Sequence, residues 1–130
     1  MHARVIARAL FAAALLAGCQ SVTGQVCTLI GCESGLSVEL TGSLGVPFRV
    51  EVTTEGSPLR MVRECPTAAD CQRIFFADYT PSSPVIRVIT GSDTTTVRRT
   101  VEYARHEPNG PGCGPICRVG VVPVDLAGTR

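Results

Sequence analysis

The chain has 130 residues, and its apolar fraction of 45% is too high for a disordered tail. This length suits a single folded domain behind a short leader. The 12 basic residues, all of them arginine, nearly balance the 11 acidic residues. The chain therefore lacks the basic excess that binding to nucleic acid or to anionic lipid requires, and we expect no nucleic-acid partner.

The first 18 residues have the composition of an export signal. Arg4 and Arg8 supply a positive start, and an unbroken apolar run covers 9–17. A helix needs roughly 20 apolar residues to span a bilayer, so this run is too short to remain as a membrane span. Two other interpretations stay open, namely an ordinary signal cut at an Ala-x-Ala-like site and an apolar N-terminal helix of a cytoplasmic protein.

The leader ends in Leu16-Ala17-Gly18-Cys19, which resembles the lipobox of bacterial lipoproteins. The resemblance implies cleavage before Cys19, a diacylglycerol thioether on its sulfur and a further acyl chain, such as palmitate, on the new amino terminus. Gln20 follows the cysteine where a retention signal would have Asp, which implies the outer membrane if the cell has one. We therefore expect an envelope protein that contacts membrane lipid through acylated Cys19.

After a short polar tether, the dominant hydrophobic period is 2, which is typical of half-buried strands. Leu36, Val38 and Leu40 alternate with polar residues, and the alternation over 46–53 is the clearest in the chain. Pro66 permits one helical turn after the third strand. The seven expected strands are 36–41, 46–53, 59–64, 73–79, 85–90, 94–105 and 119–126. The expected organisation is a leader at 1–18, a lipidated tether with a cysteine-bridged segment at 19–34, and a β-sandwich domain at 35–130.

Seven short strands in roughly 100 residues are the pattern of an immunoglobulin-like sandwich. We therefore predict an all-β, antiparallel Ig-like sandwich of about seven strands. Two features of antibody domains are missing, because the chain has no Trp and neither the second nor the sixth expected strand carries a Cys. A carboxypeptidase-regulatory or transthyretin-like sandwich is the near alternative, and a closed barrel is the third.

The chain has seven cysteines, and lipidation of Cys19 accounts for the odd one. An exported chain keeps disulfides, which favours bridges over a zinc site for the other six. These six lie in three pairs that are close in sequence: Cys27 and Cys32, Cys65 and Cys71, and Cys113 and Cys117.

The expected sandwich places the loop that holds Cys65 and Cys71 at one end and the other four cysteines at the opposite end. We therefore expect Cys65 to pair with Cys71. For the other four, proximity in sequence favours one bridge inside 27–32 and one inside 113–117. Their shared end leaves cross-pairing between the two segments open.

A second resemblance rests on the cysteine runs. The run Cys27-Thr28-Leu29-Ile30-Gly31-Cys32, a central cysteine pair and the Pro/Gly-rich run 108–118 are similar to a group of small uncharacterised bacterial lipoproteins. The resemblance covers most of the mature chain. It implies an architecture and no activity.

If the protein has a recognition surface, we expect it on the loop 106–118, because long loops in compact domains are more often functional than idle. Its prolines and a bridge inside 113–117 would stiffen it before binding, which reduces the entropy lost on binding. The interpretation that we favour for the loop is that it only caps the sandwich, with Ile116 plugging the core. The side chains expected to touch a partner are His106, Glu107, Asn109 and Arg118.

Catalysis, a bound metal and a cofactor are not expected. His106 is the one histidine after the leader, and no serine is singled out by its local context as a nucleophile. The cysteine spacings are wider than those of common zinc fingers, and the aspartates are too dispersed for a calcium loop. We predict a membrane-anchored envelope lipoprotein with a non-catalytic binding or structural module, whose partner is an envelope protein or glycan. A proteinase-inhibitor-like module that inserts 106–118 into a cleft is the alternative.

Overall fold

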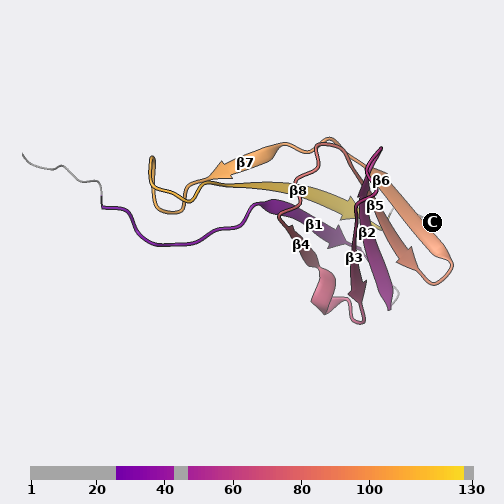
Figure 1. The fold of residues 1–130 in the computed structure, drawn as a ribbon. Helices are drawn as coiled ribbons and strands as arrows, with labels where there is room; N and C mark the ends of the chain where they lie inside the picture. The colour runs from indigo at the N-terminus through magenta and orange to yellow at the C-terminus, as the bar shows by residue number, and fades with distance from the viewer. Residues whose placement is uncertain (1–25, 43–46, 128–130) are drawn as a thin grey trace, which may run out of the picture.

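The structure is a computed structural model that describes residues 26–42 and 47–127. In these ranges the chain forms eight strands and one single-turn 3-10 helix (Figure 1). The elements are β1 (Gly35–Thr41), β2 (Phe48–Thr54), β3 (Arg60–Cys65), η2 (Ala69–Cys71), β4 (Arg73–Ala77), β5 (Pro84–Thr90), β6 (Asp93–Arg98), β7 (Tyr103–His106) and β8 (Cys117–Asp125). The lipobox, Cys19 and Gln20 lie outside the described residues. Within the described ranges, no helix has the length and apolar character that crossing a bilayer requires.

The strands form two four-stranded sheets. One has the order β4-β1-β8-β7 and the other the order β3-β2-β5-β6. Among the described strands, β1 and β8 form the one parallel pair, with Gly35 opposite Val119 and Thr41 opposite Asp125. The all-β sandwich predicted from the sequence is therefore confirmed.

The expected strand 94–105 is in fact two strands. β6 pairs with β5 in one sheet up to Arg98, and β7 pairs with β8 in the other sheet from Tyr103. Between them Val101 is buried, and its N–H donates to the carbonyl oxygen of Ser82 at 2.9 Å. The chain changes sheet at this point, so the described ranges contain eight strands where seven were predicted.

The distribution of strands between the sheets departs from the immunoglobulin order. In that order the first, second, fourth and fifth strands share a sheet. Here β1 pairs with β4 and β8, while β2 pairs with β3 and β5 in the other sheet. The transthyretin-like alternative stays a prediction.

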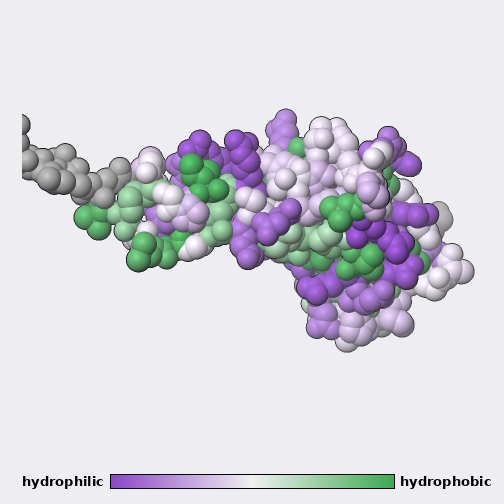
Figure 2. All heavy atoms as spheres, in the orientation of Figure 1, coloured by the Kyte–Doolittle hydropathy of each residue, from purple (hydrophilic) through white to green (hydrophobic). Residues whose placement is uncertain are grey.

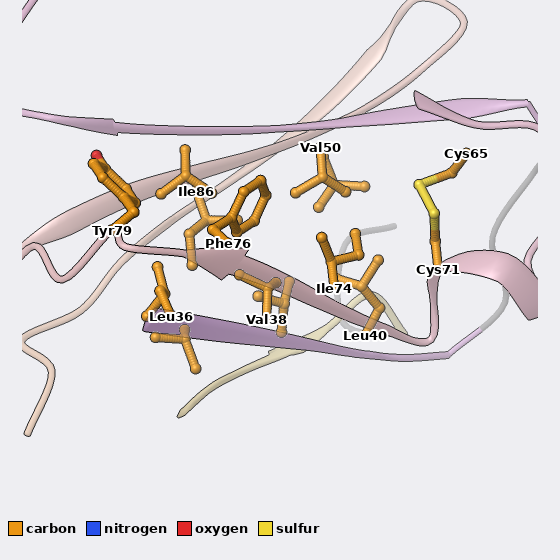
Figure 3. Close-up of a cluster of buried hydrophobic side chains, with 14 of the residues drawn as sticks. Leu36, Val38, Leu40, Val50, Cys65, Cys71, Ile74, Phe76, Tyr79 and Ile86 are labelled. Atoms are coloured by element: carbon orange, nitrogen blue, oxygen red, sulfur yellow. A yellow bond between two sulfur atoms is a disulfide. The ribbon is translucent and has the colours of Figure 1, made fainter. Parts of the chain in front are cut away.

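The core lies between the two sheets, because alternation places every second side chain of an inner strand on one face. Leu36, Val38 and Leu40 of β1 lie in one cluster with Val50 and Ile86 of the opposite sheet, and all five are buried (Figure 3). One end of this cluster is closed by a disulfide between Cys65 at the end of β3 and Cys71 in η2, with a Cα–Cα distance of 5.8 Å. This pairing confirms the prediction.

One end of the molecule projects beyond the sandwich (Figure 1). The projection consists of the segment before β1, the end of β7, and the loop that leads into β8. We call residues 26–34 together with 106–118 the arm. Because β1 and β8 are parallel neighbours, the two segments that lead into them leave the sandwich side by side.

Candidate functional site

Two disulfides join the two halves of the arm. Cys27 is bonded to Cys113 and Cys32 to Cys117, with Cα–Cα distances of 5.6 and 6.0 Å. The local bridges that sequence proximity favoured are therefore wrong, and the cross-pairing that was left open is observed.

The parallel register of β1 and β8 explains this connectivity. Gly35 lies opposite Val119, so Cys32 stands three residues before one partner and Cys117 two residues before the other. Cys27 lies five residues before Cys32, and Cys113 lies four residues before Cys117, so this second pair is aligned in the same way further from the sandwich. The two cysteine runs thus extend the strand pair as parallel segments, with each cysteine facing its counterpart.

Asn109 ties the two halves of the arm together between these disulfides. Its Oδ1 accepts hydrogen bonds from the Thr28 hydroxyl at 2.6 Å and the Ile30 N–H at 2.8 Å. Its Nδ2 donates to the carbonyl oxygens of Ile30 at 2.9 Å and Gly114 at 2.7 Å. The amide uses both acceptor positions and both donors, and the residue is only 7% exposed. The prediction that Asn109 contacts a partner is therefore wrong, because its side chain is occupied inside the arm.

Consecutive turns shape the loop around Asn109. The Gly110 N–H donates to the Glu107 carbonyl at 3.0 Å, and the Cys113 N–H donates to the Gly110 carbonyl at 3.1 Å. Pro108 occupies the second position of the first turn, where its fixed φ is favourable. Gly110 has a φ of 91°, which a residue with a side chain rarely adopts. Turns and disulfides together hold this loop in one conformation.

His106 and Arg118, both expected to contact a partner, lie on opposite faces of the β7–β8 ribbon. Residues directly opposite in adjacent strands share a face, and successive residues alternate. His106 is opposite Cys117, whereas Arg118 is opposite Arg105. The four residues predicted for recognition therefore do not form one surface.

His106 and Glu107 do come together beside a shallow hollow of about 470 Å³. Glu107 forms an ion pair with Arg105 at the base of the arm, where the Arg105 Nε lies 2.9 Å from Oε1. The hollow combines carboxylates and an imidazole with apolar and disulfide surface. Its lining consists of Cys32, Glu33, His106, Glu107, Pro108, Cys117 and Val119.

Tyr103 fixes the base of the arm on the sandwich. Its hydroxyl donates to the carbonyl oxygen of Pro81 at 2.8 Å, and its ring lies over Gly120 of β8. A Cβ built on Gly120 would come within 2.7 Å of this ring and within 2.4 Å of Val101, so only glycine fits without a shift of its neighbours. Burial and, to a smaller extent, the nearby Tyr79 raise the pKa of Tyr103 from 10.0 to about 12.

Sequence reasoning missed the exposed apolar residues of the arm. Leu29 is 100% exposed, Val26 91%, Ile30 54% and Ile116 49%. The expectation that Ile116 plugs the core is wrong. In Figure 2 hydrophobic residues gather at the end of the projection, where the described chain begins. The signal that would have found this surface is the absence of any charged residue from 26–32 and from 108–117.

The chemistry open to the arm is limited. All four of its cysteines are in disulfides, which leaves no free thiolate among them for a metal or for nucleophilic attack. Within 26–42 and 47–127, no group of three or more His, Cys, Asp or Glu side chains is placed to hold a metal ion. What the arm offers is a stiff surface for contact.

Comparison with known proteins assigns no activity. No family model, no curated protein and no solved structure matches this chain. The two resemblances noted in the sequence therefore stay predictions, and function rests on the geometry of the arm.

Proposed function

We propose that the protein is an envelope lipoprotein in which acylated Cys19 holds a non-catalytic binding module on the membrane. The observation that carries the proposal is the arm. Its first described residue, Val26, stands seven positions after Cys19, and two long-range disulfides fasten this segment to the strand pair that enters the sandwich. The segment after the anchor is therefore joined covalently to β8 as well as to β1.

The three disulfides support export. Disulfides persist in oxidising compartments such as the periplasm and the cell surface, and they are rare in the cytosol. Six cysteines are consumed in the sandwich and the arm. Cys19 is the one that remains, which is the residue that the lipobox would acylate.

The surface that fits a partner best is the hollow beside His106 and Glu107. It places titratable and apolar groups side by side on a frame that two disulfides hold. A surface that is fixed before binding loses little entropy on binding, so a small domain gains affinity without a large interface. An envelope protein or glycan is the partner class that this mixed surface suits.

One observation favours the proteinase-inhibitor-like alternative. Ile116 is half exposed on a loop that turns and disulfides stiffen, as an inserted side chain would need to be. The position of the loop weakens this alternative, because the same end of the arm carries the short tether to Cys19. A proteinase panel with the purified protein tests it directly, and failure to inhibit any class removes it.

The anchor is tested by mass spectrometry of the mature N-terminal peptide and by cell fractionation. We expect an acylated Cys19 at the amino terminus, and Cys19→Ser should move the protein from the membrane to the soluble fraction. The matched control is the double variant Cys27→Ser, Cys113→Ser, which removes two other cysteines and should stay on the membrane. An unmodified Cys19, or a mature chain that begins before it, overturns the proposal.

A further inference from the structure

The exposed apolar residues that precede β1 lie in the part of the arm beyond the Cys32–Cys117 disulfide. Asn109 bonds to the backbone of Ile30 and to the carbonyl of Gly114, so the segment that carries these side chains is held against the loop 106–118. We call Val26, Leu29 and Ile30 the tip. An exposed apolar cluster of this kind on a small domain marks an interaction site.

The charged residues of the arm are confined to part of its length. The distal stretches 26–32 and 108–117 hold no charged residue, and neither do the six residues between Cys19 and Val26. The charged side chains of the arm begin behind the tip and are exposed or partly exposed there. They are Glu33, Glu107 and Arg118, with Arg105 of β7 alongside. The separation of apolar from charged side chains is a property that elements lying in a membrane interface share.

The tether determines what lies within reach of the tip. Val26 stands seven positions after Cys19, and a chain of that length spans at most about 25 Å when fully extended. A tip held this close to an acylated cysteine meets lipid before it meets any other surface. The chain also lacks a basic excess, so zwitterionic lipid suffices and anionic lipid is not needed.

We propose that the tip lies in the lipid–water interface of the bilayer that carries the Cys19 acyl chains, and forms a second membrane contact beside them. This inference rests on the proposed function, because it takes Cys19 to be acylated. The tip rests at the boundary between headgroups and acyl chains and not deeper, since an irregular backbone is not tolerated in the hydrocarbon region. The full pairing of the Asn109 amide favours this position, because none of its polar atoms has to lose water unpaired. The contact directs the arm at the membrane and holds the sandwich away from it.

The chain has no Trp, so a single introduced Trp reports the environment of one position. The test variant is Leu29→Trp, and the matched control is Val62→Trp, at a 43% exposed position of β3 on the body of the sandwich. Each full chain is purified in its lipidated form and reconstituted in phosphatidylcholine vesicles. We expect the fluorescence of Leu29→Trp to shift to the blue, to be quenched by lipids brominated in the upper acyl chain, and to lose its quenching by aqueous iodide. Val62→Trp should show none of these changes, and added anionic lipid should not alter the result.

Each outcome decides the inference. A lipidated Leu29→Trp protein that stays open to iodide and is not quenched by brominated lipid overturns the inference and leaves the proposed function standing. Protection from iodide without quenching by brominated lipid, rising with protein density in the membrane, assigns the tip to a second copy of the chain and also overturns the inference. An N-terminal peptide without acyl groups overturns the proposed function, and the tether argument with it. Circular dichroism of both variants shows whether the fold is kept.

Discussion

The side-chain amide of Asn109 pairs with both the N–H and the carbonyl of Ile30, 79 residues away in the chain, as a neighbouring strand would. The Ile30 N–H lies 2.8 Å from Oδ1, and Nδ2 lies 2.9 Å from the Ile30 carbonyl oxygen. The same amide reaches Gly114 on its own side of the arm. One side chain therefore links the two halves of the arm by hydrogen bonds, and the two disulfides link them covalently.

Asn109→Ala should lower the free energy of unfolding by about 2 kcal/mol, because buried backbone groups of the arm lose their partner. Asn109→Asp should cost at least as much, since a buried carboxylate oxygen would then face the carbonyl oxygens of Ile30 and Gly114 with no proton to donate. Urea denaturation followed by circular dichroism measures the change, and amide hydrogen exchange at Ile30 locates it. Gln72→Ala, which removes an exposed amide, is the matched control and should be neutral. An unchanged stability of Asn109→Ala would contradict the role of this residue.

The two long-range disulfides should stabilise the protein in a non-additive way. Replacing either pair with serine should cost about 3 kcal/mol, because the other bridge still closes the long loop and only a short one is lost. Replacing both pairs should cost about 7 kcal/mol in total, since the long loop is then released as well. Local bridges would instead give about 2 kcal/mol for each pair and simple additivity. Urea unfolding of the non-reduced proteins measures these values, and peptide mapping without reduction identifies the bonded cysteines.

The disulfides show where sequence reasoning reaches its limit. Alternation located most strands because it is a local property of the chain, and Cys65 and Cys71 could be paired because no other cysteine lay near them. The other bridges depend on the parallel pairing of β1 and β8, which joins the two ends of the domain and leaves no local signal.

The remaining differences have equally local causes. The hydrophobic period of 2 continues through Val97, Val101 and Tyr103, which all stand at odd-numbered positions. The crossing from one sheet to the other inside 94–105 therefore left no break in the pattern. Asn109 is a polar residue in a Pro/Gly-rich loop and was taken for a surface group. Only the fold shows that another segment passes beside it and takes up its hydrogen bonds.

Gly120→Ala should lower the free energy of unfolding by about 1–3 kcal/mol, because its methyl group would overlap Val101 and the ring of Tyr103. Thermal or urea unfolding measures the loss. The control is Gly31→Ala, whose Cβ would have no heavy atom within 4 Å. Equal stability of the two variants would show that the ring does not rest on β8 as described.

The raised pKa of Tyr103 makes stability depend on pH in the alkaline range. The native state holds the phenol proton between pH 10 and about 12, whereas the unfolded state releases it near pH 10. The contribution is therefore fully present below pH 10 and is lost as the pH rises toward 12. The chain has no lysine to titrate in the same window. Absorbance titration of the phenolate should show the high pKa, and Tyr103→Phe should remove it together with its share of the pH dependence of unfolding.

Recognition at the hollow predicts that the two faces of the β7–β8 ribbon differ in their effect on partner binding. The double variant His106→Ala, Glu107→Ala should retain an envelope partner about tenfold more weakly, which corresponds to about 1.4 kcal/mol. Arg118→Ala, on the opposite face, should retain it normally. Asn109 is left intact because its loss would disturb the arm itself.

The measurement is capture from envelope extract on immobilised mature protein, with circular dichroism as the check on folding. Undiminished capture by the folded double variant, or an equal loss in Arg118→Ala, would show that the hollow is not the recognition surface.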